Sequence, residues 1–259
     1  ILARMRAPET TRHLERVFGQ DSFVTGPWIR SLLDRLQAIG SLLTPSGKLV
    51  GTGFALEGGR LAEALAGEWI FVTNSHVVTD ADEVVRTHGA ARPSEVIIEF
   101  TEPSEEDART FKVEEIIWTS PPEELDVTLL KLDQAFYEEV DSYPIAQHLT
   151  DPSKRPRVYI AGHPGTHDLM ISMHDNYLIE FDERLMLYRT PTNPGSSGSP
   201  VFNEEWFLVG LHRAGSEKTA RLDGSGVQEA TEGVRLSAII TALGAFLGEG
   251  SSASGAPGG

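Results

Sequence analysis

The amino-acid sequence predicts an all-β protein that forms one large domain. Over most of the chain, short apolar runs of strand length alternate with turn residues, which is the pattern of antiparallel strands. The 259 residues suffice for one large domain, and the 40% of hydrophobic residues suffice for its core. Helical spacing of apolar residues is confined to the two ends of the chain.

The N-terminal part of the chain, residues 1–37, has the spacing of helices. Apolar residues recur at helical intervals over residues 9–18 and again over residues 27–37. We therefore predict a helical N-terminal segment, followed by the main β-domain over residues 38–247.

The first half of the β-domain is expected over residues 38–132. Apolar runs separated by turns predict its strands at residues 49–56, 69–78, 95–100, 111–118 and 127–132. Between two of these runs lies the acidic stretch 102–107, which we expect to be a solvated loop.

Residues 133–155 are expected to link the two halves, and the second half is expected over residues 156–236. Apolar runs predict its strands at residues 157–160, 169–173, 177–182, 185–190, 200–202, 207–211 and 233–236. Residues 237–247 have the amphipathic spacing of a closing helix. Residues 248–259 are rich in Gly, Ser and Ala, and we expect them to form a disordered tail.

Composition argues against several classes of protein. The chain has no cysteine, which rules out a disulfide framework and favours a reducing, cytoplasmic location. No signal peptide is visible and no apolar run reaches the roughly 18 residues of a membrane span, so no membrane partner is expected. The net charge of −16 disfavours nucleic acid, because phosphate binding requires clustered Lys and Arg. The sequence shows neither a Cys/His ligand cluster nor a glycine-rich phosphate loop, so no metal or cofactor is expected.

The most informative segment is a G-x-S-G-x-P motif centred on Ser197. Glycine on both sides of the serine permits a sharp turn and lets a substrate carbonyl approach closely. In such a turn the amide N–H groups of Gly195 and Ser197 can point at one spot, as an oxyanion hole requires. Clusters of Gly, Ser and Pro are also ordinary loops, so the motif alone does not establish catalysis.

A serine nucleophile needs a base, and the base needs an orienting group. His76 lies near the end of the apolar, β-branched run 69–78, and Asp126 lies at the entrance of the apolar run 127–132. Either residue by itself fits an ordinary structural role, a satisfied histidine or a turn aspartate. Together with Ser197 they supply a base, an orienting carboxylate and a nucleophile, in the chain order His, Asp, Ser.

Four segments that contain these residues resemble trypsin-like serine peptidases of the chymotrypsin fold. They are GTGF at 51–54, VTNSHVV at 72–78, DVTLL at 126–130 and GSSGSPVF at 195–202. The resemblance covers residues 38–247 and implies two packed six-stranded antiparallel barrels, the first over residues 38–132 and the second over residues 156–236.

Within that family, the chain is most similar to the cysteine-free bacterial branch that includes HtrA-type and glutamyl endopeptidases. Residues 197–203 followed by 208–212 resemble the glutamyl endopeptidases, and GHPG at 162–165 resembles HtrA-like peptidases. The resemblance implies a serine endopeptidase that acts on a protein or peptide substrate through the catalytic triad His76, Asp126 and Ser197. It needs no metal or cofactor.

By the resemblance, the S1 pocket holds the side chain of P1, the substrate residue before the scissile bond. It should be framed by residues 191–196 and 210–215, with the substrate backbone pairing with the strand from Arg213 to Gly215. Pro191 stands near the position of the acidic S1 residue of trypsin, which disfavours a basic P1 residue.

Two further residues bear on the choice of P1. Thr192 and His212 match the threonine and histidine with which glutamyl endopeptidases hold a P1 carboxylate, and charge-assisted hydrogen bonds suit that task. The same histidine occurs in related peptidases, where it could line a small pocket. The sequence therefore leaves acidic and small or hydrophobic P1 residues open.

Three functions fit the sequence. The first is an active serine endopeptidase. The second is a catalytically silent pseudoprotease or binding module on the same fold, although no triad residue is missing. The third is the peptidase effector domain of a larger or partner-regulated bacterial system, whose silent state would show a flipped amide at Gly195.

Overall fold

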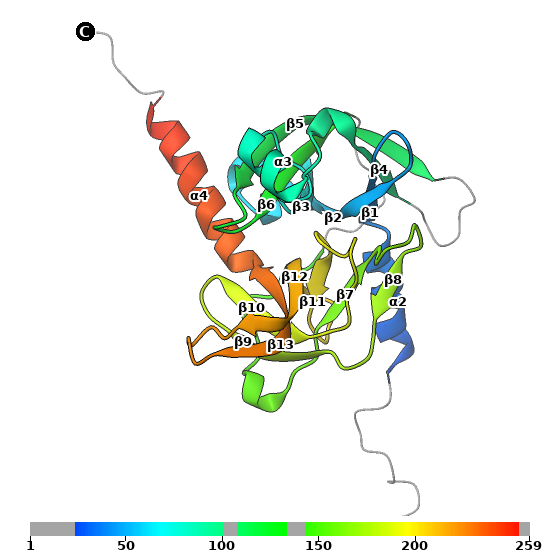
Figure 1. Ribbon diagram of the computed structural model, residues 1–259, viewed down its shortest axis with the longest axis vertical. Coiled ribbons are helices and arrows are strands. Elements are labelled where there is room, and N and C mark those ends of the chain that lie inside the picture. Colours follow the sequence, from blue (N-terminus) through cyan, green and yellow to red (C-terminus); the bar gives the residue numbers. More distant parts are fainter. Residues whose placement is uncertain (1–23, 101–107, 134–142, 254–259) are drawn as a thin grey trace, which may run out of the picture.

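The computed structural model describes residues 24–100, 108–133 and 143–253. Strands dominate, and they form two halves stacked one above the other (Figure 1). Helix α2 (Gly26–Leu36) lies beside the lower half, while helix α4 (Leu236–Ala253) rises along the side of the upper half (Figure 1). The predicted all-β fold with a helix near each end is confirmed.

The upper half is a closed antiparallel barrel with the strand order β1-β2-β3-β6-β5-β4. Its strands are β1 (Ile39–Leu43), β2 (Leu49–Glu57), β3 (Trp69–Thr73), β4 (Ile97–Phe100), β5 (Arg109–Ser120) and β6 (Val127–Leu132). Short helices occupy its connections, namely η2 (Gly58–Arg60), η3 (Glu63–Leu65), α3 (Asp82–His88) and η4 (Pro93–Glu95). The acidic stretch 102–107 lies outside the described residues.

Two details of this barrel differ from the sequence prediction. Strand β1 was not predicted, because Gly40 and Ser41 interrupt its short apolar run, yet all of its residues are buried and it pairs with both β2 and β4. The strand predicted over residues 69–78 ends early at Thr73. There the carbonyl of Asn74 accepts two backbone hydrogen bonds, which turn the chain.

The lower half is an antiparallel sheet with the order β8-β7-β11-β12-β13-β10-β9. Its strands are β7 (Tyr159–Gly162), β8 (Met170–Ser172), β9 (Tyr177–Phe181), β10 (Leu185–Arg189), β11 (Pro200–Phe202), β12 (Leu208–Ala220) and β13 (Val227–Arg235). The short helix η5 (Pro152–Lys154) precedes it.

This second sheet has seven strands rather than the six of the expected barrel, and its closure is irregular. The strands β8 and β9 follow each other closely, and β8 pairs with β7. An antiparallel bridge between Arg157, just before β7, and Tyr177, at the start of β9, connects the β9 edge of the sheet to the chain that leads into β7. The lower half is therefore a sheet that curls round toward a barrel and is linked across its gap by this one bridge.

Helix α2 confirms the prediction over residues 27–37, and it belongs to the folded domain. Trp28 packs against Trp206 with ring centroids 4.9 Å apart, and its indole N–H donates to the carbonyl of Glu204 at 2.8 Å. Two leucines of the helix are buried. The helix predicted over residues 9–18 lies outside the described residues.

Helix α4 is longer than the sequence indicated. The predicted helix covered residues 237–247, whereas α4 continues to Ala253, through part of the predicted disordered tail. Isolated glycines lower helix propensity without necessarily ending a helix, which accounts for the difference. Ile239 and Leu243 are fully buried against the sheets. Residues 254–259 lie outside the described part of the chain.

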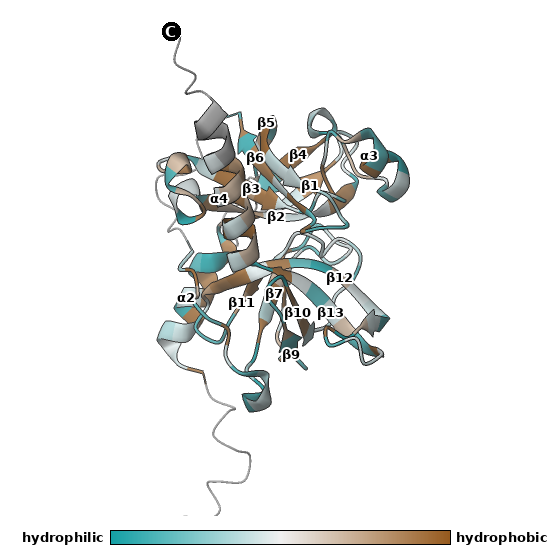
Figure 2. Cartoon of the chain, turned by 90° about the vertical axis from the view of Figure 1, so that its left-hand side faces the viewer, coloured by the Kyte–Doolittle hydropathy of each residue, from teal (hydrophilic) through white to brown (hydrophobic). Residues whose placement is uncertain are grey.

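Hydrophobic residues concentrate on the strands of both halves (Figure 2). Tyr143, from the segment expected to be a simple linker, is fully buried between them. Its ring lies 5.8 Å from that of Phe54 in the upper half and 5.3 Å from that of Phe202 in the lower half. The Tyr143 side chain thus packs against both halves. No helix of the described segments is long and apolar enough to cross a membrane.

Candidate active site

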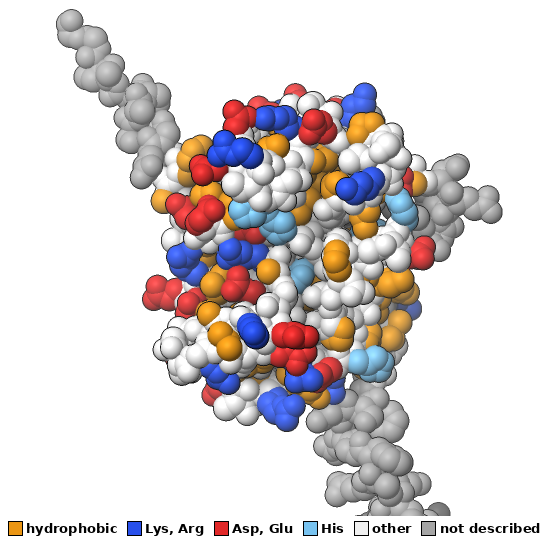
Figure 3. Space-filling model, in the orientation of Figure 1, with side chains coloured by type: hydrophobic (Ala, Val, Ile, Leu, Met, Phe, Trp, Pro, Cys, Tyr) orange, Lys and Arg blue, Asp and Glu red, His pale blue; other side chains and the backbone are white. Residues whose placement is uncertain are grey.

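The three predicted triad residues lie at the border between the two halves. His76 follows β3 and Asp126 precedes β6, and these antiparallel neighbours bring the end of one beside the start of the other. Ser197 comes from the lower half, in the turn before β11. All three line one open cavity of about 470 Å³. Several histidine side chains gather along this border in the space-filling view (Figure 3).

Asp126 and His76 form a closely held pair. Asp126 is 1% exposed, and its Oδ2 lies 2.6 Å from Nδ1 of His76. Its Oδ1 accepts hydrogen bonds from the Ser75 hydroxyl at 2.9 Å and from the backbone N–H of His76 at 3.0 Å. These contacts orient the imidazole with Nδ1 toward the carboxylate, which leaves Nε2 as the nitrogen that can take a proton.

The backbone around Asp126 is also fixed. Its φ of +53° lies in the left-handed region, which aspartate tolerates better than most residues. Its N–H donates to the carbonyl of Pro121 at 3.0 Å, and its carbonyl accepts from the buried side chain of Asn74 at 2.8 Å. The carboxylate is therefore presented from a rigid turn.

Ser197 is close to the pair but is not yet hydrogen-bonded to it. Its hydroxyl donates to the carbonyl of Arg213 at 3.4 Å, and among the described residues no hydrogen bond joins it to the His76 ring. Catalytic hydrogen bonds are often long or poorly aligned before substrate binds. The hydroxyl must leave the Arg213 carbonyl before it can donate to His76.

The turn before Ser197 has the geometry of a type II turn. The N–H of Ser196 donates to the carbonyl of Asn193 at 3.0 Å, Pro194 occupies the second position, and Gly195 at the third has φ +99°. A flip of the central peptide would give a type I turn, in which that φ is negative. Within the described residues, the N–H groups of Gly195 and Ser197 have no hydrogen-bond partner, so both remain available to an oxyanion.

Close packing allows only glycine at two positions of this turn. A Cβ on Gly195 would lie 2.5 Å from the carbonyl oxygen of His163, and a Cβ on Gly198 would overlap the carbonyl of Thr52. The Thr52 hydroxyl donates to the carbonyl of Gly195 at 2.8 Å. Strand β2 of the upper half thus supports the turn of the lower half.

The side chain of Arg213 is a part of the site that the sequence analysis missed. The guanidinium Nε lies 3.4 Å from Oδ2 of Asp126, the oxygen that also holds His76. Its Nη1 lies 3.1 Å from Glu232, and its Nη2 donates to the carbonyl of Pro122. Glu232 comes from β13, so only the pairing of β12 with β13 could have revealed this cluster.

His212 and Thr192 line the same cavity as the triad, as expected for pocket residues. His212 is 2% exposed, and its Nδ1 lies 2.9 Å from the hydroxyl of Tyr188. Burial, together with the nearby His76, lowers the pKa of His212 from 6.5 to about 3. His212 is therefore neutral at physiological pH. No group of three metal-binding side chains occurs in the described segments.

Comparisons with known proteins bear on the family and the fold of the chain. The family profile described as "Trypsin-like peptidase domain" matches residues 51–211, which contain all three predicted triad residues. A curated relative, the uncharacterized protein y4fB of Sinorhizobium fredii (strain NBRC 101917 / NGR234), is 24% identical over 182 residues. That alignment covers 62% of this chain and 26% of the relative, so the chain spans about a quarter of the relative's length.

Solved structures of two proteases share the fold. The Rv3671c protease from M. tuberculosis in its active form has a TM-score of 0.55 and 15% identity, with 82% of each chain covered. The serine endoprotease from Yersinia pestis has a TM-score of 0.54 and 16% identity, with 88% of this chain and 67% of that chain covered. The chain therefore belongs to the trypsin-like peptidase family and has the chymotrypsin fold.

Proposed function

We propose that this domain is a serine endopeptidase that cleaves proteins or peptides through Ser197, His76 and Asp126. The observation that carries the proposal is the pair of His76 and the buried Asp126 in one open cavity with Ser197. The type II turn with φ +99° at Gly195 supports it further, because that turn leaves two backbone donors free beside the nucleophile.

The chemistry follows from these positions. Ser197 Oγ attacks the substrate carbonyl carbon while its proton passes to His76 Nε2, and Asp126 stabilises the resulting imidazolium. The carbonyl oxygen becomes an oxyanion that the N–H groups of Gly195 and Ser197 bind. When the tetrahedral intermediate collapses, the C–N bond breaks and His76 protonates the leaving amine. Water, deprotonated by His76, then cleaves the acyl-enzyme and restores Ser197.

Arg213 acts in this scheme as a positioning residue. It lies against the oxygen of Asp126 that faces His76, and its charge is shared with Glu232, 3.1 Å away. An unshared guanidinium beside Asp126 would compete with the imidazolium for the same carboxylate. The second carboxylate reduces that competition while the guanidinium still fixes the orientation of Asp126.

The substrate backbone has an edge to bind. Strand β11 pairs with β12 only as far as the partners Pro200 and Leu211, so β12 has an unpaired edge from Arg213 to Gly215. These residues line the catalytic cavity. A substrate in extended conformation can add to this edge as a further antiparallel strand.

The proposal is tested by measuring peptide hydrolysis. We expect wild-type protein to cleave an unbiased peptide pool, and we expect Ser197→Ala to lower kcat/KM by about a thousandfold or more with unchanged folding. Ser46→Ala, an exposed substitution at a residue that does not line the cavity, is the matched control and should keep full activity. Turnover by Ser197→Ala within about tenfold of wild type would remove Ser197 as the nucleophile.

One observation favours a second candidate, a peptidase that stays silent until a regulatory domain or partner protein acts. The hydroxyl of Ser197 is directed at the Arg213 carbonyl and not at His76. The turn at Gly195, however, is of type II, and a silent enzyme with a flipped amide would have the other turn. A folded wild type that neither cleaves peptides nor reacts with a fluorophosphonate would support the silent candidate.

A further inference from the structure

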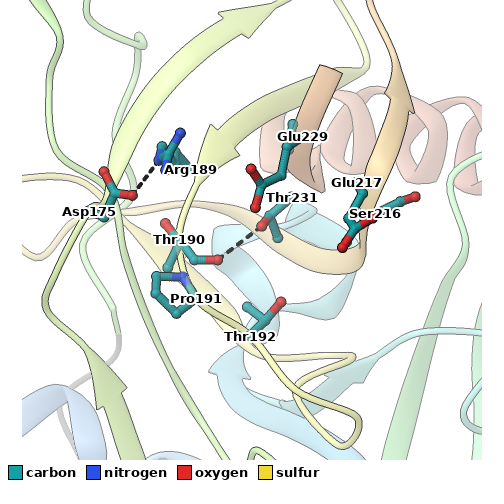
Figure 4. Close-up of a pocket in the computed structure, with 11 residues that line it drawn as sticks. Asp175, Arg189, Thr190, Pro191, Thr192, Ser216, Glu217, Glu229 and Thr231 are labelled. Atoms are coloured by element: carbon teal, nitrogen blue, oxygen red, sulfur yellow. Dashed lines mark hydrogen bonds and ion pairs between the residues drawn. The ribbon is translucent and has the colours of Figure 1, made fainter. Parts of the chain in front are cut away.

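Two cavities meet beside the nucleophile. The first holds the triad, and the second, of about 340 Å³, lies between the end of β10 and the facing parts of β12 and β13. Thr192 and Gly215 line both cavities, so they form the border between them. Figure 4 shows the second cavity, with Thr192 at one end and Asp175 and Arg189 at another.

The border leaves little space for a substrate side chain. A Cβ placed on Gly215 would lie 3.3 Å from the hydroxyl oxygen of Thr192 and 3.7 Å from that of Thr231. Carbon and oxygen atoms in contact are about this far apart, so the gap between Gly215 and the two threonines holds roughly one carbon atom. Thr231 is held in place because its hydroxyl donates to the carbonyl of Thr190 at 2.9 Å.

We propose that Thr192 and Thr231 restrict P1 to small uncharged residues such as alanine or serine by closing the passage to the second cavity. This inference rests on the proposed peptidase function and adds the substrate class to it. A P1 side chain enters beside Gly215, on the free edge of β12, where the two threonines limit its depth. A longer side chain meets a threonine hydroxyl instead of an open pocket.

An acidic P1 residue does not fit this site. His212, the residue predicted to hold a P1 carboxylate, is buried, bound to Tyr188 and neutral at physiological pH. The charges beyond the border are mainly negative, so they would repel a carboxylate. Thr192 therefore acts through its volume in this proposal and not as a carboxylate ligand.

The second cavity has the chemistry of a site for a cation. Three carboxylates line it against one guanidinium, and that guanidinium, Arg189, is paired with Asp175. Within the parts of the chain that the structure covers, neither Glu217 nor Glu229 forms an ion pair. Glu229 extends toward Arg189 (Figure 4), and both Asp175 and Glu229 raise the pKa of that guanidinium.

A buried hydroxyl without a hydrogen-bond partner also indicates that this cavity can bind a polar group. Thr190, which is 4% exposed, lines the cavity, and its hydroxyl has no hydrogen-bond partner. Unpartnered buried hydroxyls are uncommon, because each costs free energy. Opening the border should therefore admit a lysine or arginine side chain, which could be bound by the two unpaired glutamates and by this hydroxyl.

The test compares P1 preferences of size variants. Fluorogenic peptides that differ only at P1 are assayed with wild type, Thr192→Ala and Thr192→Ala/Thr231→Ala. For wild type we expect kcat/KM to be at least about tenfold higher with P1 Ala than with Lys, Arg, Phe or Glu. Each widened variant should gain about tenfold or more for Lys and Arg, with no comparable gain for Glu.

Two further variants separate the effect of side-chain size at residue 192 from the effect of its hydroxyl and from the effect of the glutamate charges in the second cavity. Thr192→Val keeps the volume of the side chain and loses the hydroxyl, so it should retain the wild-type preference. Glu217→Gln/Glu229→Gln, added to the widened variant, should remove most of the gain for Lys and Arg. Glu183→Gln, an exposed substitution outside both cavities, should leave the gain intact.

The possible failures are distinguishable because each variant is also labelled with a small fluorophosphonate, which reports an assembled triad without needing a P1 side chain. Wild type that is labelled but cleaves after Arg, Phe or Glu as readily as after Ala would overturn this inference and leave the proposed function standing. The same holds if labelled Thr192→Ala gains nothing for Lys and Arg. Wild type that is neither labelled nor active would overturn the proposed function, and the inference with it.

Discussion

Two groups share Oδ2 of Asp126, the His76 ring at 2.6 Å and the Arg213 guanidinium at 3.4 Å. If Arg213 positions the carboxylate, Arg213→Met should lower kcat by about tenfold to a hundredfold with little change in KM, because small misplacements of catalytic groups are costly. Arg213→Lys, which keeps the charge, should restore part of the rate. Arg221→Met, an exposed substitution, serves as the control. Equal kcat values in Arg213→Met and wild type would refute the positioning role.

Gly195 offers a second prediction at this scale. Gly195→Ala places a Cβ 2.5 Å from the His163 carbonyl at a φ of +99°, so the turn must move and the oxyanion donor with it. Loss of one such donor typically costs about a hundredfold to a thousandfold in kcat. Gly244→Ala adds a Cβ in open space on α4 and should have no effect on kcat. The measurement is kcat of the Gly195→Ala and Gly244→Ala variants with the same peptide, and equal kcat values would contradict the role of the Gly195 amide.

The sequence predicts some of these residues and not others, for a physical reason. The triad and the turn at Gly195 lie in short motifs whose local chemistry is visible in consecutive letters. The side-chain roles of Arg213 and Thr231 depend on the register of β12 against β13, which sets Gly215 opposite Thr231. The neutral state of His212 depends on its burial beside Tyr188, from another strand.

Helix α2 shows how an element outside the expected domain supports it. Its half-buried Trp28 lies 4.9 Å from Trp206 and 5.6 Å from Tyr159, measured between ring centroids. Trp28→Ala should therefore lower the free energy of unfolding by about 2 kcal/mol. Ile29→Ala, on the exposed face of the same helix, should change it by less than about 0.5 kcal/mol. Urea unfolding of both variants tests this, and equal midpoints would contradict the packing role.

Element boundaries were predicted best where apolar runs were continuous. Strands β2 and β6 match their predicted ranges closely. Strand β12 continues past its predicted apolar run to Ala220, and strand β13 begins before its predicted run, at Val227. Their polar outer parts form strands because they pair with each other. Hydrophobic pattern carries no signal for a ribbon that is exposed on both faces. These outer parts form one wall of the second cavity.

At the scale of the whole molecule, His212 links stability to pH. Its pKa is about 3 in the folded protein and 6.5 when unfolded, so below pH 6.5 the unfolded state binds the extra proton. The stability tied to the neutral ring is complete above pH 6.5 and is lost progressively as pH falls toward 3. At pH 5 the resulting loss in the free energy of unfolding is about 2 kcal/mol. Burial also lowers the pKa of His163, which acts in the same direction.

The measurement for this prediction is urea unfolding at pH 7 and pH 5. Wild type should lose about 2 kcal/mol more between these pH values than His212→Gln, which cannot titrate. The same pH dependence in both proteins would show that His212 does not carry the effect.

The proposed site depends on the packing of the two halves, since His76 and Asp126 come from the upper half and Ser197 from the lower half. The most direct test of the triad is therefore to react the folded chain with a fluorophosphonate and to locate the adduct by mass spectrometry of its peptides. The account predicts one adduct, on Ser197, and none with His76→Ala. An adduct elsewhere, or equal labelling of His76→Ala, would contradict it.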